Sequence, residues 1–133
     1  MSPRPKIYKK EYALELMKIA IGDLESARVL SQHQSGRLEN VAYLAHQAAE
    51  KALKALLCHL GEPIPSTQNI AVLNKLIPNG RQPRSSATLK SLTEFALARR
   101  YEESSEVLSS DDFTAAVDAT DKLIREITTI IGS

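Results

Sequence analysis

The sequence lacks the features that cross-link small secreted domains or place proteins in membranes. It has a single cysteine, Cys58, which excludes an intramolecular disulfide and is typical of a protein in a reducing compartment. No apolar run approaches the roughly 20 residues that a membrane span needs, and the N-terminus has no apolar signal-peptide core. These absences predict a soluble, cytoplasmic protein. The scarcity of glycine and the absence of tryptophan favour helices over strands.

An excess of charge of one sign is also missing. The chain carries 17 Lys and Arg against 16 Asp and Glu, a formal net charge of +1. This balance argues against a surface devoted to nucleic acid and against an acidic tail, so any anion site must be local. A length of 133 residues suits one domain with its own core. We expect a flexible basic tail over residues 1–8 and a single helical domain over residues 9–133.

Apolar residues recur at intervals of three and four along most of the chain, which is the pattern of amphipathic helices. Helices are expected over about 9–34, 41–60, 70–77, 87–101 and 110–131. No stretch alternates as a half-buried strand does. Short connections favour antiparallel neighbours, so the sequence predicts an all-α fold, an up-and-down antiparallel bundle of about five helices.

The expected helix from Val41 to Leu60 is rich in alanine, so neighbouring helices can approach it closely. Its other side carries a narrow polar stripe, whose members are neighbours because they lie three or four residues apart. The stripe consists of Gln47, Glu50, Lys51, Lys54 and Cys58. It is either a solvated face stabilised by pairs such as Glu50 and Lys54, or one wall of an anion-binding groove.

The second wall of such a groove is expected at the end of the fourth helix, where Arg99 and Arg100 precede Tyr101. Arginine binds phosphate, and tyrosine stacks on a base or hydrogen-bonds to it. In the first helix, Asp23 interrupts the apolar stripe, and an ionised carboxylate there needs a partner or contact with water. Asp23 is therefore either a helix-edge residue or a buried carboxylate that faces a cation on a neighbouring helix.

No combination of residues predicts a metal site or a catalytic site. His33, His46 and His59 lack the spacing of metal ligands, so each is interpreted as a surface or helix-edge histidine. The chain has no Ser/His/Asp signature, no glycine-rich phosphate loop and no closely spaced cysteine pair. We therefore expect no metal, no cofactor and no catalytic residue, and we interpret Cys58 as a small packing residue.

Four short motifs occur together in the chain. They are D-L-x-x-A (Asp23, Leu24, Ala27), HQAAEKALKALL (His46 to Leu57), P-x-T (Pro65 to Thr67) and R-Y (Arg100, Tyr101). In combination they resemble the HEPN family of small helical domains, whose name refers to nucleotide binding. The resemblance covers about residues 10–130. The chain is similar to small prokaryotic HEPN proteins of the kind paired with minimal nucleotidyltransferases.

This resemblance implies a helical bundle like the nucleotidyltransferase substrate-binding helical domains, commonly a homodimer and often half of a toxin and antitoxin pair. Many HEPN proteins are metal-independent ribonucleases, with an arginine followed a few residues later by a histidine. The sequence departs from that motif, because no histidine follows Arg99 or Arg100. Since arginine stays protonated, it cannot serve as the base in RNA cleavage.

These observations leave three hypotheses. The first is a HEPN protein with little or no RNase activity, a homodimer that binds a nucleotide, RNA or a minimal nucleotidyltransferase through the two-walled groove. The second is an RNase toxin whose acid or base comes from elsewhere, such as His46 or Glu50. The third is a structural dimerisation module in which the polar stripe is only a solvated face.

Overall fold

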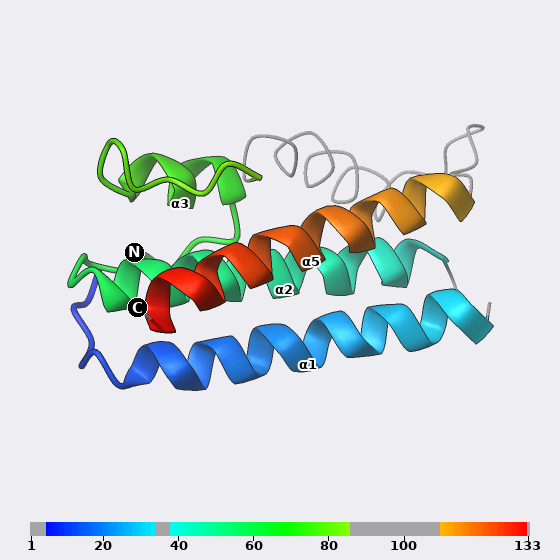
Figure 1. Ribbon diagram of the computed structural model, residues 1–133, viewed down its shortest axis with the longest axis horizontal. Helices are drawn as coiled ribbons and strands as arrows, with labels where there is room; N and C mark the ends of the chain where they lie inside the picture. Colours follow the sequence, from blue (N-terminus) through cyan, green and yellow to red (C-terminus); the bar gives the residue numbers. More distant parts are fainter. Residues whose placement is uncertain (1–4, 34–37, 86–109, 133) are drawn as a thin grey trace.

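Three long helices form the body of the part of the chain that the structure describes. The computed structural model describes residues 5–33, 38–85 and 110–132, and in it the helices are α1 (Tyr12–His33), α2 (Leu38–His59), the short α3 (Ile70–Leu76) and α5 (Ser110–Gly132). Figure 1 shows that α2 runs antiparallel to α1 and that α5 runs in the direction of α2. The described residues contain no strand, so the all-α prediction is confirmed. The helix expected over residues 87–101 lies outside the described residues.

Helix α2 is the centre of the bundle, because it contacts each of the other described helices. Its alanines are buried, and their small side chains let the neighbouring backbones come close, as the sequence predicts. Leucines of the same helix fill the remaining space. The buried residues of both kinds include Ala45, Ala48, Ala49, Ala52, Ala55, Leu53, Leu56 and Leu57. Burial of this apolar surface, worth about 25 cal/mol per Å², holds α1 and α5 against α2.

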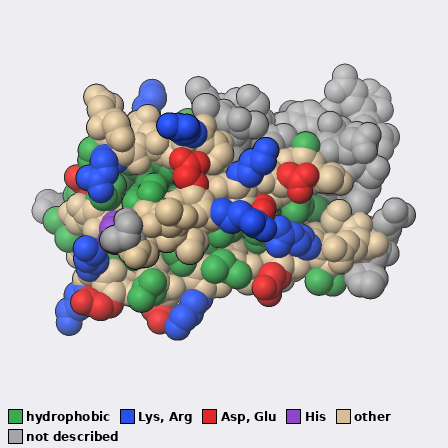
Figure 2. All heavy atoms as spheres, in the orientation of Figure 1, with side chains coloured by type: hydrophobic (Ala, Val, Ile, Leu, Met, Phe, Trp, Pro, Cys, Tyr) green, Lys and Arg blue, Asp and Glu red, His purple; other side chains and the backbone are tan. Residues whose placement is uncertain are grey.

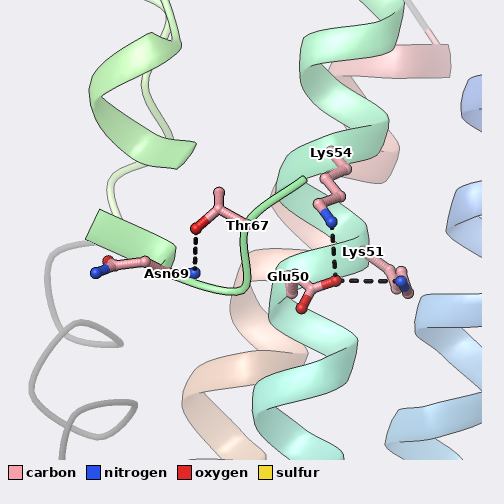
Figure 3. Close-up of polar contacts among 5 residues, drawn as sticks. All are labelled: Glu50, Lys51, Lys54, Thr67 and Asn69. Atoms are coloured by element: carbon pink, nitrogen blue, oxygen red, sulfur yellow. Dashed lines mark hydrogen bonds and ion pairs between the residues drawn. The ribbon is translucent and has the colours of Figure 1, made fainter. Parts of the chain in front are cut away.

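Helix α2 ends in a glycine turn. Gly61 has a φ of 76°, in the left-handed region that glycine adopts without steric cost. Its N–H donates to the Cys58 carbonyl at 3.1 Å, and the Glu62 N–H donates to the Leu57 carbonyl at 2.9 Å. These are the two bonds of a Schellman motif. The turn reverses the chain, and the connection that follows passes beside the second half of α2 (Figure 3).

A capping residue ends that connection and begins α3. The side-chain oxygen of Asn69 accepts hydrogen bonds from the N–H groups of Ala71 and Val72, at 2.9 and 3.2 Å. Asparagine is favoured at this position because it satisfies donors that have no partner within the helix. Thr67 Oγ1 in turn accepts from the Asn69 N–H at 3.1 Å. Together these bonds define the path of the connection next to α2 (Figure 3).

The segment before α1 is paired with the same connection. The Ile64 N–H donates to the Lys6 carbonyl at 2.8 Å, and the Lys6 N–H donates to the Ile64 carbonyl at 3.2 Å, which makes an isolated antiparallel bridge. The bridge brings a second segment of the chain to this end of α2. The division into a tail over residues 1–8 and a domain over residues 9–133 stays a prediction.

The surface carries charges of both signs. Figure 2 shows Lys and Arg side chains interspersed with Asp and Glu over the visible face. Asp121 of α5 pairs with Arg28 of α1 at 2.7 Å and with Arg125 of its own helix at 2.8 Å. Such partly exposed pairs contribute about 0–1 kcal/mol each. Within the described ranges, no helix is long and apolar enough to cross a membrane.

Candidate functional site

The polar stripe of α2 converges on a buried carboxylate. Glu50 is only 2% exposed, and its Oε2 accepts hydrogen bonds from the ammonium groups of Lys51 and Lys54, each at 3.1 Å (Figure 3). Helix geometry explains Lys54, which lies one turn after Glu50. Lys51 reaches the same oxygen from the side of α1. Two ammonium groups around one buried carboxylate leave a local excess of positive charge, so the stripe is more than a solvated face.

Gln47 and Asp23 lie at the edges of this cluster. Gln47 is half-buried, one turn before Lys51 on α2. Burial raises the pKa of the Asp23 carboxyl on α1, the positive charge of Lys51 lowers it, and the negative charge of Glu50 raises it. Asp23 therefore feels both charges of the neighbouring helix, which favours the interpretation in which it faces a cation there.

A pocket of about 260 Å³ lies beside the cluster, between the start of α1, the second half of α2 and the connection to α3. Three lysines line it: Lys6 from the segment before α1, and Lys51 and Lys54 from α2. We call it the lysine pocket. Its other lining residues are Tyr8, Tyr12, Leu16, Ile64, Pro65 and Ser66. Cations from separate parts of the chain thus meet at one hollow, which gives the pocket a local positive charge.

Two tyrosines form the aromatic side of the lysine pocket. The rings of Tyr8 and Tyr12 stack, with centroids 5.0 Å apart and 22° between their planes. They are 39% and 40% exposed, so ring surface stays open to a ligand. The sequence analysis does not single out Lys6 or either tyrosine as part of a site. No helical spacing could have found the pair, because Tyr8 lies before the start of α1 and only Tyr12 is within it.

His46 lies one turn before Glu50 and is 3% exposed, so its interpretation as a surface or helix-edge histidine is wrong. The reason is that α2 is covered by several elements, which buries helix edges that would be open on a peripheral helix. Burial lowers the pKa of the imidazole, while the charge of Glu50 and the backbone of Gln68 raise it. Neither ring nitrogen makes a hydrogen bond of ordinary geometry. The ring is therefore neutral at pH 7.

The burial of His46 and Glu50 argues against their use as the acid or base of an RNase. A general acid or base must reach the reacting atoms of its substrate, whereas His46 and Glu50 are 3% and 2% exposed. Neither side chain is placed to touch an RNA at the surface. In the part of the chain that the structure describes, no three His, Cys, Asp or Glu side chains gather in a way that could hold a metal ion.

Cys58 is a packing residue, as the sequence predicts. It is buried, and its thiol donates a hydrogen bond to the Lys9 carbonyl at 3.2 Å. Burial raises the pKa of the thiol, so little reactive thiolate forms at neutral pH. The thiol ties the end of α2 to the segment that precedes α1.

The other expected wall, made of Arg99, Arg100 and Tyr101, lies outside the described residues. Its position opposite Lys51 and Lys54 stays a prediction. Within the described residues, the two lysines meet the segment before α1 and the connection between α2 and α3.

Comparisons with known proteins agree with the motifs in the sequence. The model of the HEPN domain matches residues 13–130. The fold is similar to the crystal structure of an archaeal HEPN homologue, with a TM-score of 0.66 over 94% of this chain and 99% of that chain. The two sequences are 22% identical, so this likeness concerns the fold alone. No curated protein is significantly similar to the sequence.

Proposed function

The chain belongs to the HEPN family, and on that premise we propose that it binds the phosphate group of a nucleotide or an RNA in the lysine pocket. One observation carries the proposal: Lys6, Lys51 and Lys54 line a single hollow beside a stacked pair of tyrosines. Lysine ammonium groups bind phosphate as point charges, and aromatic faces bind bases. The pocket thus offers both kinds of contact that a nucleotide needs.

The hydrogen-bonding capacity of the lysines supports a phosphate ligand. An ammonium group carries three donors. Lys51 and Lys54 each direct a donor at Glu50, which holds the two groups close to one another at the wall of the pocket. Their remaining donors are available to phosphate oxygens. Lys6 is exposed and adds a third positive charge from the opposite segment.

The size of the pocket supports a single nucleotide unit. Its volume of about 260 Å³ lies just below the usual range of small-ligand sites, about 300–1,000 Å³. A phosphate and its sugar fit such a volume, and the base would lie at the rim against Tyr8 or Tyr12. Stacking of one base on an aromatic side chain is worth about 1–3 kcal/mol.

The wider setting of this function follows from the family. We place Arg99, Arg100 and Tyr101 on the far side of the bound ligand, with Gln47, Glu50 and Asp23 supporting the lysines. Without a histidine after Arg100, the protein binds RNA or nucleotide with little or no cleavage. The proposal includes a cytoplasmic homodimer that pairs with a minimal nucleotidyltransferase in a toxin and antitoxin system. Growth arrest and RNA degradation on expression of the chain alone would instead support the RNase hypothesis.

Binding of a fluorescent ATP analogue and of a short 5′-phosphorylated RNA tests the proposal. Lys6→Ala is the most direct variant, because the side chain is exposed and the bridge to Ile64 uses only backbone atoms. We expect its loss to weaken binding several-fold. Lys122→Ala is the matched control, since Lys122 is an exposed lysine on α5 that does not line the pocket. Equal affinities for the wild type and both variants would reject the site.

A further inference from the structure

Two side chains of α2, one helical turn apart, carry buried polar atoms that make no hydrogen bond of ordinary geometry. These atoms are Nδ1 and Nε2 of His46 and Oε1 of Glu50. The two side chains are 3% and 2% exposed. Buried polar atoms in proteins are nearly always hydrogen-bonded, so three such atoms on two residues that face each other across one helical turn call for an explanation.

The other oxygen of Glu50 links this pair to the lysine pocket. Oε2 accepts from both Lys51 and Lys54, the two pocket lysines of α2. In the ligand-free protein the buried carboxylate thus neutralises part of the charge that attracts an anion. A phosphate in the pocket competes for the same ammonium groups. As the phosphate attracts these ammonium groups, their interaction with the buried carboxylate weakens. A buried carboxylate with weakened partners is unfavourable.

His46 is the group that can compensate. Residues four apart on a helix are neighbours, so the ring can present an N–H to the free Oε1 of Glu50. A protonated ring donates from both nitrogens. Its positive charge can replace the ammonium charge that a ligand draws away from the carboxylate. The ring is neutral in the ligand-free protein because burial lowers its pKa. One of its two ring nitrogens is therefore unprotonated and can accept a proton.

We infer that binding of an anion in the lysine pocket is coupled to the uptake of a proton by the His46–Glu50 pair. The inference rests on the proposed function, which supplies the phosphate as the anion. The proton comes from water and adds to the unprotonated ring nitrogen of His46. The imidazolium then hydrogen-bonds to Oε1 of Glu50 and balances the carboxylate, whose Lys51 and Lys54 partners now share their positive charge with the ligand.

Charged and polar groups on the neighbouring elements also affect the protonation of His46. Asp23 on α1 adds negative charge near Glu50, which increases the need for a compensating proton. The backbone of Gln68, on the connection to α3, favours the protonated ring. Lys51 and Lys54 already pair with Glu50 in the ligand-free protein, so a further positive charge on His46 is needed only when the ligand takes up part of their charge.

The coupling has a definite sign. Because the complex holds more protons than the free protein, affinity falls as pH rises from the pKa of His46 in the free protein to its higher pKa in the complex. For the uptake of one full proton, the dissociation constant rises by about tenfold per pH unit. Partial uptake gives a proportionally smaller slope.

Isothermal titration calorimetry with a short oligoribonucleotide that ends in hydroxyl groups tests the inference. Its phosphodiesters do not titrate near neutral pH, so any proton taken up belongs to the protein. Binding enthalpies at pH 7 in two buffers of different ionisation enthalpy give the number of protons. We expect uptake by the wild type and by His59→Gln, and none by His46→Gln. Binding with no proton uptake by the wild type overturns the inference alone, whereas no binding rejects the proposed function as well.

An NMR measurement on the unmodified protein covers the case in which His46→Gln does not fold. The ¹⁵N shifts of the His46 ring distinguish the neutral from the protonated imidazole. At pH 7 we expect a neutral ring without the oligoribonucleotide and a protonated ring at saturation. A ring that stays neutral in the saturated complex overturns the inference.

Discussion

Lys54 donates a hydrogen bond to Glu50 across one turn of α2, at 3.1 Å, and the carboxylate that accepts it is 2% exposed. On a solvated helix such a pair contributes only about 0.2–0.5 kcal/mol. Burial changes its importance, because water cannot replace a lost partner of Glu50. The same contact also orients one of the cations of the lysine pocket, so stability and the proposed binding depend on one pair of residues.

Lys54→Met should therefore destabilise the protein by about 2 kcal/mol, because it removes one of two partners of a buried carboxylate. Urea unfolding at pH 7 measures the change as a lower midpoint at an unchanged slope. Lys18→Met is the matched control: Lys18 and its partner Glu15 are 74% and 61% exposed, so we expect a change below about 0.5 kcal/mol. A similar small effect for both variants would show that Glu50 does not depend on Lys54.

The turn after α2 allows a second comparison. Gly61→Ala should destabilise the protein by about 1 kcal/mol, since an alanine at a φ of 76° is strained although no atom lies within 4 Å of the added Cβ. Gly22→Ala should do the opposite. Gly22 lies within α1 with nothing within 4 Å of the new Cβ, and alanine is favoured over glycine in a helix by about 1 kcal/mol. Thermal unfolding of both variants checks the pair, and a stabilised Gly61→Ala would contradict the strain argument.

Stability should also depend on the protonation of His46. Its pKa is below 6.5 in the folded protein, so at mildly acidic pH the unfolded chain binds a proton that the folded protein does not. The contribution of His46 to stability is therefore full well above the unfolded pKa of about 6.5, and it is lost as pH falls from there through the lower folded pKa. His59 has a lowered pKa and acts in the same direction, while the raised pKa of Asp23 acts in the opposite direction at lower pH.

Urea unfolding at several pH values separates these contributions. His46→Gln should flatten the dependence on pH more than His59→Gln does, because His46 is the more deeply buried of the two. The reverse order would mean that His46 is already protonated in the folded protein.

Arg100→Ala should weaken the binding of ATP or RNA if the end of the fourth expected helix forms the second wall of the site. The change removes a guanidinium that can bind a phosphate through two parallel hydrogen bonds. Arg81→Ala is the control, because Arg81 is an exposed arginine that does not line the lysine pocket. Unchanged affinity for Arg100→Ala, together with weakened binding for Lys6→Ala, would confine the site to the lysine pocket.

Much of the fold could be predicted because the apolar spacing and the capping residues of helices are local sequence patterns. The apolar spacing around Ala45 to Leu57 predicts the central helix, and the structure confirms its burial. Gly61 and Asn69 mark an end and a beginning through their own backbone and side-chain preferences. These preferences involve only a few neighbouring residues, so they can be recognised in the sequence without the tertiary structure.

The site could be predicted only in part. Lys51 and Lys54 belong to the polar stripe, for which the sequence leaves two interpretations, a solvated face or one wall of an anion-binding groove. The sequence predicts a flexible tail that includes Lys6, whereas the structure pairs Lys6 with Ile64, a residue far away in the sequence. No local sequence pattern predicts the contact between Lys6 and Ile64. The pocket depends on this contact, which brings the segment with Lys6 and Tyr8 to α2.

The sequence by itself determined the helical class, the family and the identity of the residues that carry charge on α2. Only the tertiary structure decided what those charges do. Whether Glu50 and His46 are solvated or buried depends on which elements cover α2, and that is set by packing between distant segments. Once water is excluded, an ordinary helical pair becomes a buried charge cluster with atoms still lacking hydrogen bonds, and its lysines become one wall of a pocket.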